Sequence, residues 1–371
     1  MEFSIKRDAL LKSLNLAQGI IEKKNTLPIL SNVLLKAQED KLFIIATDLD
    51  IVFYDTIDNV KVSKKGETTT SATVLYDILR KISSNSEVYF SLKSNNQLSL
   101  RADNSDFNLK CLPADNFPNF AEEFNNSEII LNKSQFLSLI NKTKISISND
   151  DTRHYLNGIF MHLTDSQNKS YLTAVATDSH RLSSSSIEIE KGKQFASLIL
   201  PKKTVYQLSN LLQEAEDKIF MLTSDTKIQF KIGNTSLVSK IIDGKFPDYR
   251  KVVPTNNDKT LTVSSKDFIE SVERVATVSV DRKEGVKLEI NKDKIKLSVN
   301  STTSGEGNEI IKANYNSEEL TISFNSRYLI DIVSEIQDTN VKMNLKDPVS
   351  PVLIEDNSDR NSYYVIMPMK I

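Results

Sequence analysis

The feature that most constrains this chain is an internal repeat, in which one helical pattern recurs three times along 371 residues. Apolar residues spaced 4, 3 and 4 positions apart share one face of a helix. In the first copy these are Leu10, Leu14, Ala17 and Ile21. Shifts of 126 and then 132 positions give the next two sets, which are Phe136, Ile140, Thr143 and Ile147, then Phe268, Val272, Val275 and Ser279.

Other marks recur in the same order. A short strand precedes each of these helices, at residues 3–5, 129–131 and 261–263. A second helix is expected at residues 73–82, 204–212 and 327–336, and the strand end Ala46-Thr47-Asp48 returns as Ala176-Thr177-Asp178. Most of the remaining chain alternates apolar and polar residues between turn residues, which predicts strands. The expected fold class is α+β, with three tandem copies of a domain in which two helices pack on antiparallel sheets.

The repeat sets the expected domain bounds at residues 1–125, 126–256 and 257–371, with polar linkers near 122–127 and 254–259. A single cysteine, Cys111, excludes internal disulfides. No stretch approaches the ~20 apolar residues of a membrane-spanning helix, and the N-terminus lacks the layout of a signal peptide, so we expect a cytoplasmic protein without a membrane partner. The net charge of −2 means that any contact with nucleic acid must come from local groups of cations.

The segment Asp178-Ser179-His180-Arg181 combines a hydroxyl, an imidazole and a carboxylate. A catalytic triad, however, brings its members together from separate elements, and neighbours on one turn cannot all converge. A turn or a binding role is therefore the better interpretation. The alternative is an enzyme centred on Asp178, His180 and Arg181.

Three further candidates also favour structural roles. Asp48-Leu49-Asp50 is expected to be a polar turn, because no third metal ligand is near in the sequence. Gly305-Glu306-Gly307 lacks the third glycine of a dinucleotide-binding loop and is expected in a hairpin loop. Cys111 lies in an alternating segment and is expected to pack inside a strand. The sequence thus predicts no catalytic residue, no metal and no cofactor.

Basic residues lie on or beside the helices of all three copies, where they could contact phosphates. Acidic residues interleave with them, so a mixed, solvated helix surface is the alternative interpretation. The residues concerned include Lys6, Arg7, Lys12, Lys133, Lys142, Lys144, Lys202, Lys203, Lys266 and Arg274.

Several ordered motifs make the chain resemble one family along its whole length. They are Thr26-Leu27-Pro28-Ile29-Leu30, Tyr155-Leu156-Asn157-Gly158, Ala176-Thr177-Asp178-Ser179-His180-Arg181-Leu182, Phe246-Pro247-Asp248-Tyr249-Arg250 and Met367-Pro368-Met369-Lys370. The chain resembles the bacterial sliding clamps, the β subunits of DNA polymerase III.

The resemblance implies a non-catalytic processivity factor. Two chains would form a homodimeric ring around double-stranded DNA and slide without reading its sequence. An ATP-dependent clamp loader would open the ring, and short linear motifs would tether the DNA polymerase III catalytic subunit, other polymerases and repair proteins. A protein that only scaffolds partners through three domains remains a weaker alternative. The residues implied to face DNA are Lys12, Lys24, His154, Tyr155, Lys202 and Lys203.

The resemblance also implies a pocket for partner peptides between the second and third domains. Its walls would be Arg153, Tyr155, Leu156, Thr177, His180, Arg181, Leu182, Pro247, Val252, Asn325, Tyr328, Val349, Met367, Pro368 and Met369. The dimer interface would join Phe107 and Leu109 of one chain to Thr277 and Val278 of the other. The chain departs from the family pattern at a few of these places, among them Lys24, Asp150, His154, Ser179 and Thr277.

Overall fold

The computed structural model describes residues 1–22, 27–120, 124, 128–213, 218–279 and 285–370. Contacts within the chain divide it into two compact units. The first comprises Met1–Ser134, Lys193–Phe195 and Lys203–Ile241, and the second comprises Gln135–Gly192, Ala196–Lys202 and Ile242–Ile371. Strands of the middle copy therefore belong to both units. The linker expected at residues 122–127 lies outside the described residues, apart from Phe124.

Helices form where the repeat predicts them. The first helix of each copy is α1 (Arg7–Gln18), α3 (Lys133–Lys144) or α5 (Ser265–Ala276). The second is α2 (Ala72–Lys81), α4 (Lys202–Gln213) or α6 (Ser326–Val333). Every residue of the three predicted apolar faces is buried, including the small polar residues Thr143 and Ser279. Burial of these faces against the sheets is the main stabilising term for helices of this length.

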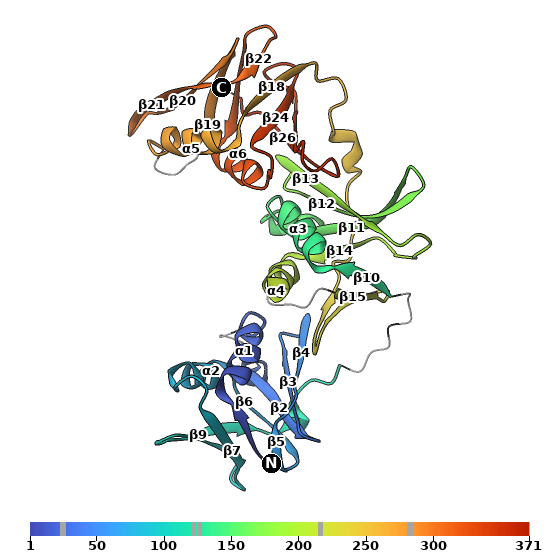
Figure 1. Cartoon of the computed structure of the whole chain (residues 1–371), viewed down its shortest axis with the longest axis vertical. Coiled ribbons are helices and arrows are strands. Elements are labelled where there is room, and N and C mark those ends of the chain that lie inside the picture. The colour runs from blue at the N-terminus through green and yellow to red at the C-terminus, as the bar shows by residue number, and fades with distance from the viewer. Residues whose placement is uncertain (23–26, 121–123, 125–127, 214–217, 280–284, 371) are drawn as a thin grey trace. The chain divides into compact units, whose positions relative to one another are not determined.

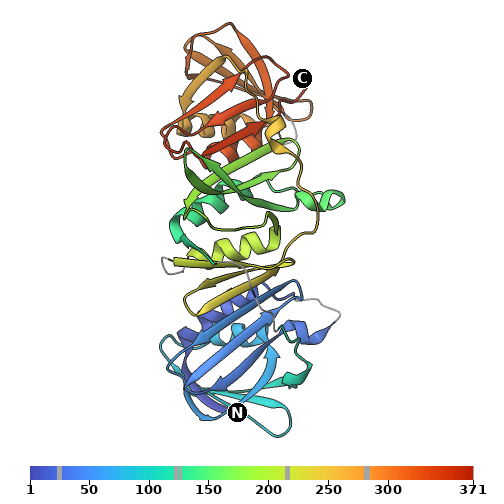
Figure 2. The same ribbon diagram turned by 90° about the vertical axis from the view of Figure 1, so that its right-hand side faces the viewer.

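The first unit is built on one 13-stranded sheet whose pairs are all antiparallel. In Figure 2, its strands cross in front of the blue helices α1 and α2, which pack side by side. The strand order is β10 (Ile129–Asn132), β15 (Lys218–Thr223), β16 (Lys227–Ile232), β17 (Thr235–Lys240), β4 (Ile51–Ile57), β3 (Lys41–Thr47), β2 (Asn32–Gln38), β6 (Gly66–Ser71), β9 (Ser105–Leu112), β8 (Gln97–Ala102), β7 (Glu87–Leu92), β1 (Glu2–Lys6) and β5 (Lys61–Lys64).

The second unit contains two antiparallel sheets, and α5 and α6 pack together beside them (Figure 1). The larger sheet has the order β14 (Leu198–Pro201), β11 (Gly158–Ser166), β12 (Lys169–Thr177), β13 (Arg181–Ile189), β26 (Ser362–Ile366), β25 (Val352–Glu355), β24 (Asn340–Leu345), β18 (Lys259–Ser264) and β22 (Asn314–Tyr315). The smaller has the order β21 (Gly305–Lys312), β20 (Lys294–Ser301), β19 (Gly285–Asn291) and β23 (Leu320–Asn325).

Two of the predicted turns behave differently. Residues 48–50 form a turn in which the Asp48 carboxylate accepts hydrogen bonds from the amides of Asp50 and Ile51, as expected for a polar turn. The prediction for Gly305-Glu306-Gly307 was wrong, because these residues open strand β21, where Gly305 pairs with Ser301. The turn itself precedes them, since polar residues at 302–304 reverse the chain. Cys111 is buried in β9, as predicted, and burial raises the pKa of its thiol.

Candidate peptide surface, DNA-facing residues and open strand edges

Two strands from different copies meet at the centre of the larger sheet in the second unit. Strand β13 of the middle copy pairs with β26 of the third copy, with Leu182 opposite Val365. Directly after β26, the amide of Met367 donates to the carbonyl of His180 at 2.8 Å. Two residues later, the amide of Met369 donates to the carbonyl of Ser323 at 2.7 Å. The C-terminal residues 367–369 are therefore held by the turn that precedes β13 and by strand β23 of the smaller sheet.

That turn carries the motif identified in the sequence. The Asp178 carboxylate accepts hydrogen bonds from the amides of His180 and Arg181, both at 2.9 Å, and from the Arg181 guanidinium at 3.1 Å. Ser179 has a φ of 75°, a left-handed conformation that glycine adopts more easily. The carboxylate thus holds the turn and its arginine, and the carbonyl of His180 is left to bind the C-terminal segment.

Arg181 packs between this turn and helix α6. Its side chain is 8% exposed and its guanidinium donates to Asp331 at 2.7 Å. The guanidinium carbon lies 4.2 Å from the centre of the Tyr328 ring, and the His180 ring stacks on the same tyrosine with centroids 6.5 Å apart. Burial raises the pKa of Tyr328, aided by the charge of Asp178. The predicted pocket members His180, Arg181 and Tyr328 therefore form one stacked group.

Several other predicted pocket residues are exposed apolar side chains. Val349 is 73% exposed, Val252 is 50% exposed and Met367 is 39% exposed, and Pro247 is exposed as well. Large exposed apolar groups of this kind mark sites of interaction when they gather. Leu156 and Leu182 were also expected as walls, but they are buried at 3% and 2% exposure and belong to the core beneath. We call the exposed residues, together with His180 and Tyr328, the peptide surface, after the role that the resemblance implies for them.

The remaining predicted members have defined local roles. The Thr177 hydroxyl donates to the carbonyl of Arg181 at 2.7 Å, and the Asn325 side chain caps α6 by accepting from the amides of Arg327 and Tyr328. Arg153 donates to the Ser179 hydroxyl at 2.6 Å and to Asp150 at 2.9 Å. Pro368 and Met369 are half-buried, with the Met369 sulfur beside Gly285.

One residue at this place was missed by reasoning from the sequence. Val365 pairs with Leu182 and belongs to the same buried cluster, together with Phe246 and Tyr249. The alternation of residues 362–366 could have placed it on the same sheet face as Met367. Its burial makes it part of the floor of the peptide surface.

The residues expected to face DNA differ in their availability. Lys12 is exposed on α1, and His154 is exposed with its ring 3.2 Å from the carbonyl of Asp243. Tyr155 is half-buried against the core cluster, and Lys202 contacts the Asn149 side chain. Lys203 is already engaged, because its ammonium lies 2.5 Å from Asp48 and 3.3 Å from Glu22. Lys24 lies outside the described residues.

Two charged residues bind other side chains of the protein. Lys142 was grouped with the cations that could contact phosphates, and that prediction was wrong. Its side chain is 3% exposed and its ammonium lies 2.6 Å from Asp359, in the turn before β26. Asp150, which we did not assign to DNA, accepts hydrogen bonds from Thr152 and Arg153, and these lower the pKa of its carboxyl.

The residues expected at the dimer interface lie along strand edges and at a helix end. Phe107 and Leu109 are on β9, which pairs with β8 from Ser105 to Lys110 but meets β6 only through Cys111 and Leu112. Thr277 is the exposed C-terminal cap of α5, and Val278 packs partly on the core of the third copy. Strand β21 lies beside α5 and is the last strand of its sheet.

Known proteins match this chain over its whole length. Family models for the N-terminal, central and C-terminal domains of the DNA polymerase III beta subunit match residues 1–121, 130–248 and 250–370. The chain belongs to the β sliding clamp family. It is 36% identical to the beta sliding clamp of Caulobacter vibrioides and 33% identical to that of Escherichia coli K12, with all of both chains covered in each case.

Solved sliding clamps have the same fold. The beta sliding clamp of Caulobacter crescentus superposes with a TM-score of 0.96 at 36% identity, covering 100% of this chain and 99% of that one. The sliding clamp of Bartonella birtlesii, solved bound to griselimycin, gives a TM-score of 0.96 at 37% identity and covers both chains completely. The chain is thus a clamp of three tandem domains, and the threefold repeat is the signature of that fold.

The geometry of this clamp does not favour the alternative of an enzyme at residues 178–181. The Asp178 carboxylate binds the turn amides and Arg181, so it does not orient an imidazole in the way a triad requires. His162 is buried against Phe160, and its ring lies 3.0 Å from the Tyr249 hydroxyl, which is a packed core arrangement. Across the described residues, no group of three His, Cys, Asp or Glu side chains could hold a metal ion, and no helix could span a membrane.

Proposed function

We propose that two copies of this chain close head to tail into a ring that encloses duplex DNA and tethers the replicative polymerase. Membership of the sliding clamp family supports this function. The chain would hold the polymerase on its template and so raise its effective concentration there, without catalysing a reaction itself. We take its domains as residues 1–125, 126–256 and 257–371, and place its action in the cytoplasm, where a bacterial chromosome is replicated.

The observation that carries the ring proposal is a strand junction that occurs twice within the chain. Strand β4 of the first copy pairs with β17 of the second, and β13 of the second pairs with β26 of the third. The matching strand of the third copy is β21, which is left as a sheet edge. The strand of the first copy that matches β17 is β9, most of which is also unpaired on one side.

A second copy would supply the missing partner at both edges. Pairing β21 with β9 of another chain repeats the same antiparallel junction for a third time. Phe107 and Leu109 then face the helix side of the sheet, near Thr277 and Val278 at the end of α5. A head-to-tail contact of this kind closes when the rotation between subunits divides a full turn, as it does in a dimer. It also removes two exposed edges that would otherwise invite aggregation.

Contact with DNA in this proposal is loose and electrostatic, since tight base contacts would prevent sliding. The exposed Lys12 and His154 and the half-buried Lys202 are the described residues that best fit such a role. Lys203 would have to leave Asp48 and Glu22 to reach a phosphate, so we give it a smaller part. The low net charge is compatible with a contact that does not hold DNA in one place.

The peptide surface would receive short motifs from the DNA polymerase III catalytic subunit, other polymerases and repair proteins, and an ATP-dependent clamp loader would open the ring. Exposed valine and methionine side chains adapt to different apolar partners, while His180 and Arg153 supply polar contacts. The griselimycin-bound structure of the Bartonella birtlesii clamp supports the idea that clamps of this family bind compact ligands.

Retention on circular DNA tests the proposal directly. The chain is loaded onto a nicked circular plasmid with a clamp loader and ATP, and free protein is removed by gel filtration. We expect the bound protein to stay on the circle and to leave within minutes once the plasmid is cut at one site. Equal rates of loss from cut and intact plasmids would show that binding is not topological and would overturn the ring.

A further inference from the structure

A connecting segment, residues 243–252, lies between β17 and β18 and carries two members of the peptide surface, Pro247 and Val252. Across the described residues, no amide of this segment donates a hydrogen bond to the backbone of a strand. Its buried residues are Phe246 and Tyr249, and the other residues of the segment are exposed. These two rings are therefore its main attachment to the second unit.

The two rings attach to one face of β11 through a row of aromatic contacts. Phe246 stacks on Phe160, with ring centroids 4.9 Å apart and an angle of 6° between the planes. Phe160 stacks on His162 at 4.9 Å, and the His162 ring lies 5.8 Å from the ring of Tyr249. Nε2 of His162 is 3.0 Å from the Tyr249 hydroxyl, in a buried contact. This bond is a polar link between the connecting segment and the sheet.

The hydrogen bonds of His162 show which form of the imidazole the structure holds. Nδ1 lies 3.0 Å from the carbonyl of Leu163, which can only accept, so Nδ1 carries the proton of the neutral ring. Nε2 then accepts from the Tyr249 hydroxyl. A second proton would occupy Nε2 itself, so the hydroxyl would have to turn away as a donor. The charge would also be placed on a residue that is 9% exposed.

The surroundings of the ring oppose this second proton. Burial lowers the pKa of His162 and the Arg250 guanidinium lowers it further, whereas the hydrogen bond to the Leu163 carbonyl raises it. The titratable and charged groups on this side of the sheet are Asp248, Tyr249, Arg250 and Lys251 of the connecting segment, Lys169 and Tyr171 of β12, Glu188 of β13 and Tyr363 of β26. The two carboxylates among them form ion pairs with the two lysines.

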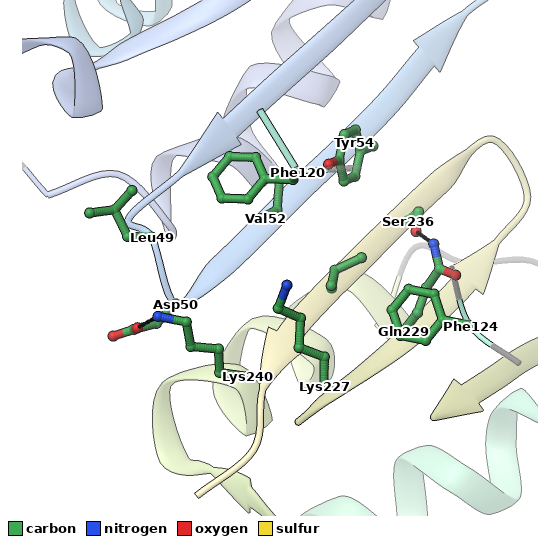
Figure 3. Close-up of a pocket in the computed structure, with 11 residues that line it drawn as sticks. Leu49, Asp50, Val52, Tyr54, Phe120, Phe124, Lys227, Gln229, Ser236 and Lys240 are labelled. Atoms are coloured by element: carbon green, nitrogen blue, oxygen red, sulfur yellow. Dashed lines mark hydrogen bonds and ion pairs between the residues drawn. The ribbon is translucent and has the colours of Figure 1, made fainter. Parts of the chain in front are cut away.

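The first junction has a different residue at the place of Tyr249. Residues 117–120 repeat the pattern of residues 246–249, which puts Phe120 at the matching position and removes the hydroxyl. Phe120 and Tyr54 line a cavity of about 300 Å³ at the junction of β4 with β17 (Figure 3). The ring of Tyr249, in contrast, belongs to the buried cluster under the peptide surface.

The partner of the hydroxyl is also replaced at the first junction. His162 lies opposite Thr173, three residues before the Ala-Thr-Asp turn of its copy. Lys36 has the same place in β2, since it lies opposite Phe43, three residues before the first Ala-Thr-Asp turn. Lys36 forms an ion pair with Glu67 at 3.5 Å. The bond between the imidazole and the hydroxyl is thus specific to the junction that carries the peptide surface.

We propose that His162 is a positioning residue of the peptide surface, which holds the connecting segment through the Tyr249 hydroxyl when neutral and releases it when protonated. Release displaces Pro247 and Val252, and the apparent affinity for a peptide falls with the fraction of chains in which the segment is in place. The proposal rests on the proposed function of the peptide surface. It adds a dependence of peptide binding on pH.

The sign of this dependence follows from the burial of the ring. Once the segment is displaced, the ring is exposed and takes up a proton at its ordinary pKa of about 6.5. In the docked form the pKa of His162 is lowered. The docked form is therefore fully stabilised above about pH 6.5 and loses that stabilisation as the pH falls.

Substitutions at the two ends of the bond test the positioning role at pH 7.5. Isothermal titration calorimetry measures the affinity of the full chain for a C-terminal tail peptide of the polymerase III catalytic subunit. We expect Tyr249→Phe to lower this affinity by about fivefold, as for the loss of one buried hydrogen bond. His162→Leu should have a similar effect, and the double variant should lose no more than either alone, because both remove the same bond.

Tyr315→Phe is the matched control. It removes another buried tyrosine hydroxyl, which donates to the carbonyl of Glu318 at 2.6 Å in the third copy. Its effect on peptide affinity should be less than about twofold, because independent sites do not couple. Equal affinities of Tyr249→Phe and the unaltered chain would overturn the proposal, and so would equal losses in Tyr249→Phe and Tyr315→Phe.

The pH profile distinguishes positioning from simple packing. In His162→Gln the amide oxygen can accept from the Tyr249 hydroxyl, but the side chain cannot be protonated. Between pH 7.5 and pH 5.5 we expect the unaltered chain to lose about fivefold more affinity than His162→Gln. His180 and the peptide titrate in both chains, so the difference reports His162. Parallel profiles would contradict the proposal.

A tryptophan reporter separates this proposal from the proposed function. The chain contains no tryptophan, so Val252→Trp places a single one on the connecting segment. We expect its fluorescence anisotropy to fall between pH 7.5 and pH 5.5, and to stay constant when the chain also carries His162→Gln. Failure of the unaltered chain to bind the tail peptide would overturn the function proposed for the surface, while a falling anisotropy would still support the hold of His162 on the segment. A constant anisotropy in both chains would overturn that hold.

Discussion

The two strand junctions inside this clamp, β4 with β17 and β13 with β26, have the same backbone arrangement but differ in the ion pairs that stabilise them. In both, a threonine hydroxyl, an aspartate carboxylate and a residue of positive φ form the turn before the junction strand, with Leu49 at 81° and Ser179 at 75°. The β13–β26 junction adds buried charges, since Lys142 reaches Asp359 and Arg181 reaches Asp331. The β4–β17 junction has an exposed pair, Lys240 with Asp50, and a pair with one exposed partner, Lys203 with the buried Asp48.

This difference indicates that the second junction is the rigid one. A buried ion pair loses much of its stabilisation to the cost of desolvation, but removal of one partner leaves an uncompensated charge in the core. Exposed pairs contribute little and are screened by salt. The peptide surface therefore lies on a floor whose geometry is strongly specified, whereas its counterpart at the first junction keeps an open cavity.

The largest effect should come from breaking the buried pair. We expect Lys142→Met to lower the free energy of unfolding by about 3–5 kcal/mol, because the half-buried Asp359 and the buried Asp356, 4.0 Å from the same ammonium, lose their cation. Lys240→Met, which breaks an exposed pair at the other junction, should leave the unfolding midpoint unchanged within error. Urea denaturation followed by circular dichroism at pH 7 measures both variants. Similar midpoints for the two variants would contradict the difference between the junctions.

The pH dependence of that effect has a definite sign. Burial raises the pKa of Asp359, but hydrogen bonds from Lys142, Ser362 and the Asn361 amide outweigh it, and the net pKa is lowered. A carboxyl with a lowered folded pKa contributes stability above its unfolded pKa of about 4 and loses that stability as the pH falls further. The deficit of Lys142→Met should therefore be full at pH 7 and shrink below pH 4.

The next largest effect concerns the junction that one chain leaves open. We expect Val278→Asp to weaken the proposed dimer by at least about 100-fold, because a carboxylate would be buried without a partner where β21 meets β9 of the second chain. Lys266→Glu, at the other end of α5, is the control and should dimerise normally. Sedimentation equilibrium measures the dissociation constants. If both variants remain equally dimeric, the third junction has been placed wrongly.

A smaller effect should separate the two internal junctions as binding sites. Met367 follows β26 and Lys240 ends β17, and their amides make the corresponding bonds to the carbonyls of His180 and Asp50. We expect Met367→Glu to lower the affinity for a C-terminal tail peptide of the polymerase III catalytic subunit by about 10–20-fold, since an exposed apolar contact is lost and a charge is introduced. Lys240→Glu should change this affinity by less than about twofold. Isothermal titration calorimetry with the full chain distinguishes the two outcomes.

The sequence predicted the parts of this comparison that depend on local periodicity. Each predicted helix face is buried because a spacing of 4, 3 and 4 leaves one side apolar whatever the helix packs against. The burial of Lys142 and its ion pair with Asp359 could not be predicted in this way. It lies in the last turn of α3, where a cation suits the helix dipole, and its partner Asp359 is 217 residues away in the chain.

The candidate sites show the same limit. Met367 and His180 could be assigned by resemblance, because their motifs are contiguous in the sequence. Val365 and the cavity at the first junction could not be found, since both depend on which residues lie opposite each other across strands. Gly305 was misplaced for a related reason, as its pairing with Ser301 is set by a polar turn that precedes it.

The smallest effect tests the turns on which both junctions depend. A non-glycine residue at positive φ destabilises the folded state by about 1–3 kcal/mol, and replacing it with glycine removes that strain. The replacement also costs about 0.5–1 kcal/mol, because glycine gives the unfolded chain more conformational entropy. Leu49→Gly should therefore stabilise the protein by about 1 kcal/mol. Ser179→Gly should gain about half as much, because it also removes the hydroxyl that accepts a hydrogen bond from Arg153.

Ser179→Ala separates the two contributions at the second turn. It keeps the positive φ and removes the same hydrogen bond, so we expect it to lower the free energy of unfolding by about 1 kcal/mol. Urea midpoints for the three variants should thus follow the order Leu49→Gly, Ser179→Gly, Ser179→Ala, from most to least stable. A stabilising Ser179→Ala would mean that the bond from Arg153 strains the turn instead of holding it, and that the two turns are built on different principles.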